Sequence, residues 1–183
     1  MTTVTRQTSV APSAELTAAF RREAGSLLGF FLRRDVTAHD AADLVSETFL
    51  AAWRGSTRRE IEPEMLRPWL FGIARKVLSQ HRRGRIRRTA LADRVRSTLP
   101  TGDHAEPDGA PAGDERDLAE HVRELIRNLP ELDQEIVRLV YWEGFTQEEV
   151  ATIVGKSAAA VRARLSRARG VLRTLLQESA DVD

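Results

Sequence analysis

Cysteine is absent from this chain of 183 residues. Its absence excludes disulfide bonds, thiol catalysis and cysteine-bound zinc. The histidines do not replace the missing thiolates, because all four are scattered without the spacing of metal ligands. They are His39, His81, His104 and His121. The sequence therefore predicts a protein without a metal site, and we expect no cofactor.

Long apolar segments, and segments in which apolar and polar residues alternate, are missing as well. No segment approaches the roughly 20 apolar residues of a membrane-spanning helix, and the first residues lack the hydrophobic core of a secretory signal. We therefore expect a cytoplasmic protein with no membrane insertion. No strand-like alternation of useful length occurs, whereas apolar residues recur at helical spacing along most of the chain. The predicted fold class is all-α.

Charge is segregated along the chain, although the formal net charge is only +1. Residues 75–96 contain nine arginines and lysines and one acid. Residues 101–117 contain six acids and one arginine, and no acid lies between positions 156 and 177. Solvated helix faces would explain either basic block by itself. Two basic blocks separated by an acidic one indicate two nucleic-acid-binding surfaces joined by a spacer.

The periodicity divides the chain into two small helical domains. A polar tail, 1–13, is expected to be disordered and precedes the first domain, 14–90. An acidic linker, 91–117, contains three prolines and three glycines and has no periodic apolar face, so we expect it to be flexible. The second domain spans 118–178, and a short tail, 179–183, follows it.

Three amphipathic helices are predicted in the first domain. The third spans about 65–88, and we expect it to begin at Pro68, because proline suits the first turn of a helix. The apolar stripe of the first helix consists of Leu16, Phe20, Leu27, Leu28, Phe31 and Leu32. That of the second helix, which Thr37 can cap, consists of Leu44, Val45, Phe49 and Ala52.

An acidic strip lies along the second predicted helix. Asp40, Asp43 and Glu47 recur at three- and four-residue spacing, so their carboxylates share one exposed face. A solvated, well-capped helix would explain this pattern without any partner. The functional interpretation is a docking face for a partner with a complementary basic surface.

Residues 145–170 have the pattern of a helix-turn-helix. Thr146 and Glu149 can form a capping box, Gly155 permits the sharp turn, and Ser157 can cap the second helix. The predicted buried stripe of that second helix consists of Val161, Leu165, Ala168 and Leu172. Its arginines occupy the other faces. A helix that is apolar on one side and cationic elsewhere suits a DNA major groove lined by phosphates.

The three tryptophans are interpreted as packing residues. Trp53 and Trp69 lie on apolar stripes, which favours the core over base stacking. Trp142 stands beside Tyr141 at a predicted helix end, where we expect it to seal the second domain.

The order of these motifs resembles that of bacterial RNA polymerase sigma factors of the sigma-70 superfamily. Segments 40–54 and 66–83 resemble region 2 of the extracytoplasmic-function (ECF) group, and 129–145 with the helix-turn-helix, 146–165, resembles region 4. A single helix-turn-helix is weak evidence for a family. Two independent motifs in the family's order are much more specific.

The resemblance implies three binding surfaces and no catalytic residues. The acidic helix would bind the coiled coil of the polymerase's largest subunit through Asp40, Asp43, Leu44, Glu47, Phe49 and Trp53, although Leu44 and Phe49 are expected to pack the core. The minus-ten element would contact Arg75, Lys76, Gln80, His81, Arg82 and Arg83. The minus-thirty-five element would contact Lys156, Ser157, Ala159, Ala160, Arg162, Arg164 and Arg167.

The roles of the cationic residues in region 4 can be divided further. Arg162 or Arg164 could read guanine edges in bidentate fashion, whereas Lys156 and Arg169 are expected to neutralise phosphates. The family's function is to direct core polymerase to promoters and to help open the duplex. Family members are commonly restrained by an anti-sigma factor, so we expect core polymerase, promoter DNA and an anti-sigma factor as partners.

Two alternatives belong to other classes. A conventional helix-turn-helix regulator would act without core polymerase on a symmetric operator, and the acidic strip argues against it. A DNA-processing enzyme would need a nucleophile or metal-binding carboxylates in a cleft. Ser26 and Ser46 lie in plain helical contexts without partners, so we do not expect an enzyme.

Overall fold

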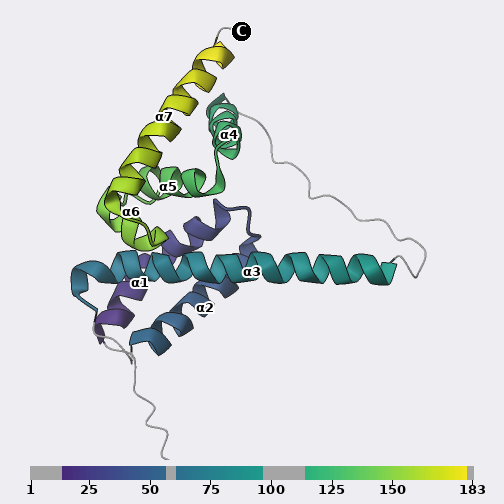
Figure 1. Ribbon diagram of the computed structural model, residues 1–183. Coiled ribbons are helices and arrows are strands. Elements are labelled where there is room, and N and C mark those ends of the chain that lie inside the picture. The colour runs from purple at the N-terminus through teal and green to yellow at the C-terminus, as the bar shows by residue number, and fades with distance from the viewer. Residues whose placement is uncertain (1–13, 57–60, 97–113, 181–183) are drawn as a thin grey trace, which may run out of the picture. The chain divides into compact units, whose positions relative to one another are not determined.

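The computed structural model describes residues 14–56, 61–96 and 114–180, and every regular element in these ranges is helical (Figure 1). The prediction of an all-α fold is confirmed. The chain divides into two compact units between His81 and Arg82, and each unit is described by itself. Residues 1–13, 57–60, 97–113 and 181–183 lie outside the described residues. These ranges include the predicted N-terminal tail and most of the predicted linker.

The first unit is built from α1 (Ala14–Leu32), α2 (Ala38–Ser56), a 3-10 turn η1 (Pro63–Met65) and the first half of α3 (Leu66–Arg96). The helices α1 and α2 pack against each other. One cluster of buried side chains joins all three helices and consists of Leu16, Ala19, Ala52, Leu66 and Leu70. The predicted packing of Trp53 and Trp69 is confirmed, since both rest against this cluster.

A buried arginine organises the turn between α1 and α2. Only 1% of Arg34 is exposed, and its guanidinium lies 3.6 Å from the centroid of the Phe30 ring. Its Nη1 donates to the Phe30 carbonyl oxygen at 2.9 Å, which satisfies a carbonyl at the end of α1. Beyond the turn, Thr37 Oγ1 accepts a hydrogen bond from the Asp40 backbone N–H at 3.2 Å, as predicted for the cap of α2. The start of the acidic helix is thereby fixed.

The predicted apolar stripe of α1 was too wide. Leu28 and Leu32 are 36% and 43% exposed, although both were expected in the core, and Phe30 is fully buried instead. Each of these leucines follows a buried residue, Leu27 or Phe31, by one position. One position turns the side chain about 100° around the helix, which is enough to carry it out of the interface.

The predicted start of α3 was also wrong. The helix begins at Leu66, two residues before Pro68, which is accommodated in the first turn because no intrahelical N–H bond is needed there. Its C-terminal end lies at Arg96, and α4 begins at Asp114, so residues 91–96 and 114–117 are helical. The acids at 114–117 suggested a spacer, but acids also stabilise the N-terminal turn of a helix.

The second unit contains α4 (Asp114–Arg127), α5 (Glu131–Tyr141), α6 (Gln147–Val154) and α7 (Ala158–Ala180). The long helix α7 packs on each of the other three. Its Val161, Leu165 and Ala168 are buried as predicted. The core that they meet includes Ile126, Ile136, Leu139, Phe145 and Val150.

The predicted caps of the helix-turn-helix are confirmed. Thr146 Oγ1 accepts from the Glu149 backbone N–H at 3.3 Å, and Glu149 Oε2 accepts from the Thr146 backbone N–H at 2.8 Å. Gly155 ends α6 in the left-handed conformation with φ of 67°. Ser157 Oγ accepts from the Ala160 backbone N–H at 3.2 Å and so caps α7. The short helix α6 therefore has both ends fixed by local interactions.

Replacement of Thr146 by alanine should lower the free energy of unfolding of the second unit by about 1 kcal/mol, because the Glu149 backbone N–H loses its acceptor, Thr146 Oγ1. Thr152→Ala is the matched control on the same helix, where the hydroxyl only donates to the Glu148 carbonyl oxygen, and its effect should stay within about 0.5 kcal/mol. Urea unfolding followed by circular dichroism measures both. Equal effects of the two substitutions would contradict the capping role.

Candidate functional site

The acidic strip on α2 is only partly open to a partner. Asp43 and Glu47 are exposed, with 72% of the Asp43 side chain accessible. Asp40 is half-buried, and its Oδ2 lies 3.9 Å from Nε2 of His81 on α3. His39, one turn before Asp43, approaches the Asp43 carboxylate at the same distance of 3.9 Å. Asp43 and Glu47 are therefore the carboxylates best placed to meet another molecule.

The apolar residues predicted for polymerase binding stand behind this strip. Leu44 is 3% exposed and belongs to the core of the first unit. Phe49 and Trp53 are half-buried against the cluster that joins the three helices, and the Phe49 ring lies 4.5 Å from the ring of Phe20. These side chains hold α2 in place, as expected for Leu44 and Phe49, while the carboxylates point outward.

The cationic residues of α3 form a row along its exposed side. Lys76, Gln80 and Arg83 are exposed and follow each other at four- and three-residue spacing. Arg87 is exposed as well and continues the row by one more turn. Arg87 was not among the residues assigned to the minus-ten element, although the same spacing could have indicated it.

The other residues predicted for the minus-ten element lie differently. Arg75 is half-buried, and Arg82 is exposed next to the row. The side chain of His81 is only 14% exposed and faces Asp40 on α2. His81 is thus neither an exposed bystander nor a member of the cationic row, and its position favours a contact between α2 and α3.

One face of α7 is exposed and has little side-chain bulk. Arg162 and Arg167 are exposed on it, separated by the exposed Ala163 and Ser166, which the sequence prediction omitted. Helical spacing places these four residues on one side of α7. The same spacing could have indicated Ala163 and Ser166 from the sequence. Ala159 is exposed one turn earlier on the same side. Such a face lets the helix approach a groove closely while two guanidinium groups reach toward base edges or phosphates.

The remaining predicted contacts of α7 have roles within the protein. The hydroxyl of Ser157 caps the helix, and Ala160 is half-buried. Arg162 Nη1 lies 3.3 Å from Glu148 Oε1 on α6, in an exposed ion pair of the kind that contributes little to stability. Arg164 Nη1 donates to Asp133 Oδ1 on α5 at 2.8 Å. Lys156 is exposed in the turn before the helix.

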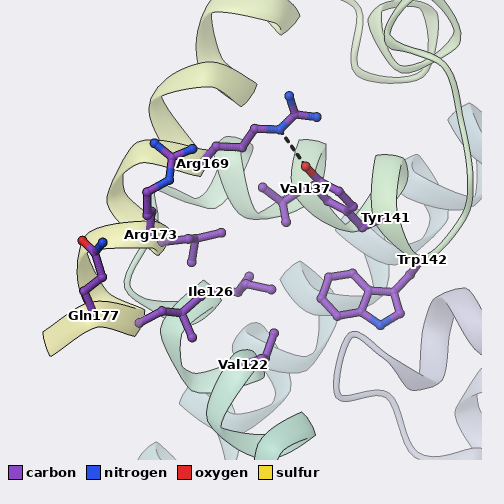
Figure 2. Close-up of a pocket in the computed structure, with 10 residues that line it drawn as sticks. Val122, Ile126, Val137, Tyr141, Trp142, Arg169, Arg173 and Gln177 are labelled. Atoms are coloured by element: carbon purple, nitrogen blue, oxygen red, sulfur yellow. Dashed lines mark hydrogen bonds between the residues drawn. The ribbon is translucent and has the colours of Figure 1, made fainter. Parts of the chain in front are cut away.

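A groove opens between α4, α5 and α7, and Trp142 lines it rather than sealing the unit as predicted. This side chain is 42% exposed, because α5 ends at Tyr141 and the next residue leaves the packed face of the helix. The groove has a volume of about 730 Å³ and is lined by Val122, Ile126, Val137, Tyr141, Trp142, Arg169, Leu172, Arg173, Leu176 and Gln177. Figure 2 shows Trp142 on the opposite side of the groove from Arg173 and Gln177.

Charge at the groove is of one sign. Arg169 Nε donates to the Tyr141 hydroxyl at 2.6 Å, as drawn in Figure 2, and Arg173 follows one turn later on α7. No acid is among the lining residues. An apolar groove with arginines at its edge suits an amphipathic helix that carries acids. Within the described residues, no group of acids and histidines could hold a metal, and none of the helices could span a membrane.

Comparison with known proteins gives matches for both units. Residues 19–88 match the family described as Sigma-70 region 2, and residues 119–172 match Sigma-70, region 4. The chain is 33% identical over 152 residues to a probable RNA polymerase sigma factor, RfaY, of Xanthomonas campestris pv. campestris, covering 82% of this chain and 37% of RfaY. It is 28% identical over 173 residues to the ECF RNA polymerase sigma factor SigL of Mycobacterium tuberculosis, covering 93% of each chain.

A solved structure shares the fold. The sigma factor RpoE of Bartonella quintana, in complex with the anti-sigma factor NepR, superposes with a TM-score of 0.62 at 24% identity. The superposition covers 89% of this chain and 97% of RpoE.

Replacement of Leu44 by alanine should lower the free energy of unfolding of the first unit by about 2–5 kcal/mol, because it leaves a cavity behind the acidic strip. Leu50→Ala is the matched control on the same helix, since Leu50 is 42% exposed, and its effect should stay within about 0.5 kcal/mol. Urea unfolding measures both. A stable Leu44→Ala protein that had lost only polymerase binding would instead place Leu44 in the interface.

Proposed function

The chain belongs to the sigma-70 family of RNA polymerase sigma factors, and we propose that it directs core polymerase to promoters by reading their minus-ten and minus-thirty-five elements. The relative SigL adds the narrower assignment to the ECF type. The observation that carries the proposal is the pairing of two opposite surfaces in one chain. One is the exposed carboxylate strip on α2, and the other is the cationic face of a capped helix-turn-helix.

The first step of the proposed mechanism is docking on polymerase. Asp43 and Glu47 lie one turn apart on α2, and the buried Leu44 and Ala52 prevent that helix from shifting. Two carboxylates on a rigid helix lose little conformational entropy when they meet a basic coiled coil. They also accelerate encounter with a positively charged surface.

The second step is capture of the minus-ten element. The row of Lys76, Gln80, Arg83 and Arg87 offers three cations at regular spacing along one side of α3. Such a row can follow the phosphates of a strand over several nucleotides. By holding one strand after it separates, the row would favour the open duplex without any bond-breaking chemistry.

The third step is recognition of the minus-thirty-five element by α7. Arg162 and Arg167 supply the donors for guanine edges or phosphates, and the small Ala163 and Ser166 between them allow close approach. Binding of both elements positions the polymerase active centre at the start site. The chain itself contributes recognition and no catalysis.

A conventional regulator that acts without polymerase is the alternative. It would need the helix-turn-helix, but it gives no role to the exposed carboxylates on α2. The sigma factor proposal gives both surfaces a partner, and we therefore favour it.

We further propose that an anti-sigma factor restrains this chain through the groove of the second unit. The structural neighbour RpoE forms a complex with an anti-sigma factor, which supports a partner of this kind. The groove is apolar, carries Arg169 and Arg173, and has no acid among its lining residues. An amphipathic helix with acids on its edge would therefore fit it.

Reversal of the strip should abolish promoter-directed transcription. Asp43→Lys combined with Glu47→Lys places cations against a basic partner, and we expect at least about tenfold weaker association with core polymerase. Run-off transcription and titration of core polymerase with the labelled chain measure this effect. Glu15→Lys combined with Glu62→Lys is the matched control, since it reverses two exposed acids elsewhere in the first unit. Unchanged association for the α2 double variant would refute the docking role.

An acid introduced into the groove should relieve inhibition. Leu176→Asp adds a negative charge to the groove lining, and we expect at least about tenfold weaker inhibition of run-off transcription by an anti-sigma protein that inhibits the wild-type chain. Val171→Asp is the control on the same helix, because Val171 is similarly exposed but does not line the groove. Equal inhibition of both variants would exclude the groove as the binding site.

A further inference from the structure

Asp133 and Arg164 form an ion pair that joins the first turn of α5 to α7. Arg164 Nη1 donates to Asp133 Oδ1 at 2.8 Å, and the two side chains are 35% and 10% exposed. The carboxylate is largely shielded from water, and the N-terminus of α5 adds a favourable dipole. The pair is therefore a fixed contact between two helices rather than a surface pair in exchange with water.

Arg164 lies off the open side of α7. At about 100° per residue, Arg162, Ser166, Ala163 and Arg167 fall within an arc of about 140°. Arg164 is about 130° from the centre of that arc, next to the buried stripe of the helix. A guanidinium in this position meets α5 and not a groove that faces the open arc.

Apolar packing alone controls the rotation of α7 weakly. Its first turn meets the neighbouring helices through the half-buried Ala158 and Ala160, whose small side chains offer little interlocking. The burial of Val161 and Leu165 favours contact but has no directional preference, whereas a charged hydrogen bond does. The Asp133–Arg164 pair supplies that direction about two turns into the helix.

We propose that Arg164 is a positioning residue, and that its bond to Asp133 fixes the rotation of α7 about its own axis. This rotation decides which bases the face of Arg162 and Arg167 meets. The proposal rests on the sigma factor function proposed above, and it assigns to Asp133 and Arg164 a share in promoter specificity without contact to DNA.

The test uses the full chain with core polymerase on a library of minus-thirty-five sequences. Arg164→Met and Asp133→Ala each remove one partner of the bond. Both variants should therefore lower the ratio of transcription from the best sequence to that from the average sequence about tenfold, and the bases affected should be the same. The double variant should add little to either single variant. The dependence of promoter binding on salt should stay as in the wild type, because no phosphate contact is lost.

Arg167→Ala is the control for an arginine that does contact DNA, and it should lower the salt slope by about one unit. The same fall in slope for Arg164→Met, with wild-type preference for Asp133→Ala, would overturn the proposal. Circular dichroism at the assay temperature verifies folding, and Arg164→Lys, which can keep one bond to Asp133, should retain part of the preference. A wild-type holoenzyme without any minus-thirty-five preference would refute the proposed function itself.

Discussion

Burial of a narrow apolar stripe on each functional helix is the interaction on which the rest of this structure depends. The helix α7 carries five exposed or half-buried arginines and no acid between residues 158 and 176, so its own charges repel each other. Val161, Leu165 and Ala168 offset this repulsion by packing against α5 and α6. The helix α2 is likewise apolar on its buried side and charged on its exposed side, since Leu44 and Ala52 are buried beneath the carboxylates. Each proposed binding surface is thus the charged side of a helix whose other side is in the core.

Local features of the structure followed from the sequence because their physics involves neighbours in the chain. The capping box of Thr146 and Glu149 spans three residues, and so does the cap that Ser157 provides for α7. The left-handed turn at Gly155 depends on a single residue without a side chain. Such features leave a pattern that can be recognised without knowing what lies across the fold.

Pairs between distant segments left no such pattern. Asp133 and Arg164 are 31 positions apart, and although helical spacing puts Arg164 beside the buried stripe, it does not identify Asp133 as its partner. His81 stands among arginines in the sequence but faces Asp40 across the packing of α2 and α3. For Leu28, Leu32 and Trp142, the apolar character was evident, but the side of the helix that becomes the interface depends on the packing partner. The candidate surfaces could therefore be located from the sequence, whereas the division of their residues into contacting and supporting ones could not.

Segregation of charge explains how one nearly neutral chain can hold two unlike partners. A net charge of +1 provides almost no long-range attraction to either DNA or polymerase as a whole. At short range, the carboxylates of α2 repel phosphates, and the arginines of α7 repel a basic coiled coil, so neither surface can accept the partner of the other. Each helix therefore excludes the wrong partner by its own charge. This exclusion needs no fixed arrangement of the two units in the free chain, because the charge of each surface belongs to its own helix.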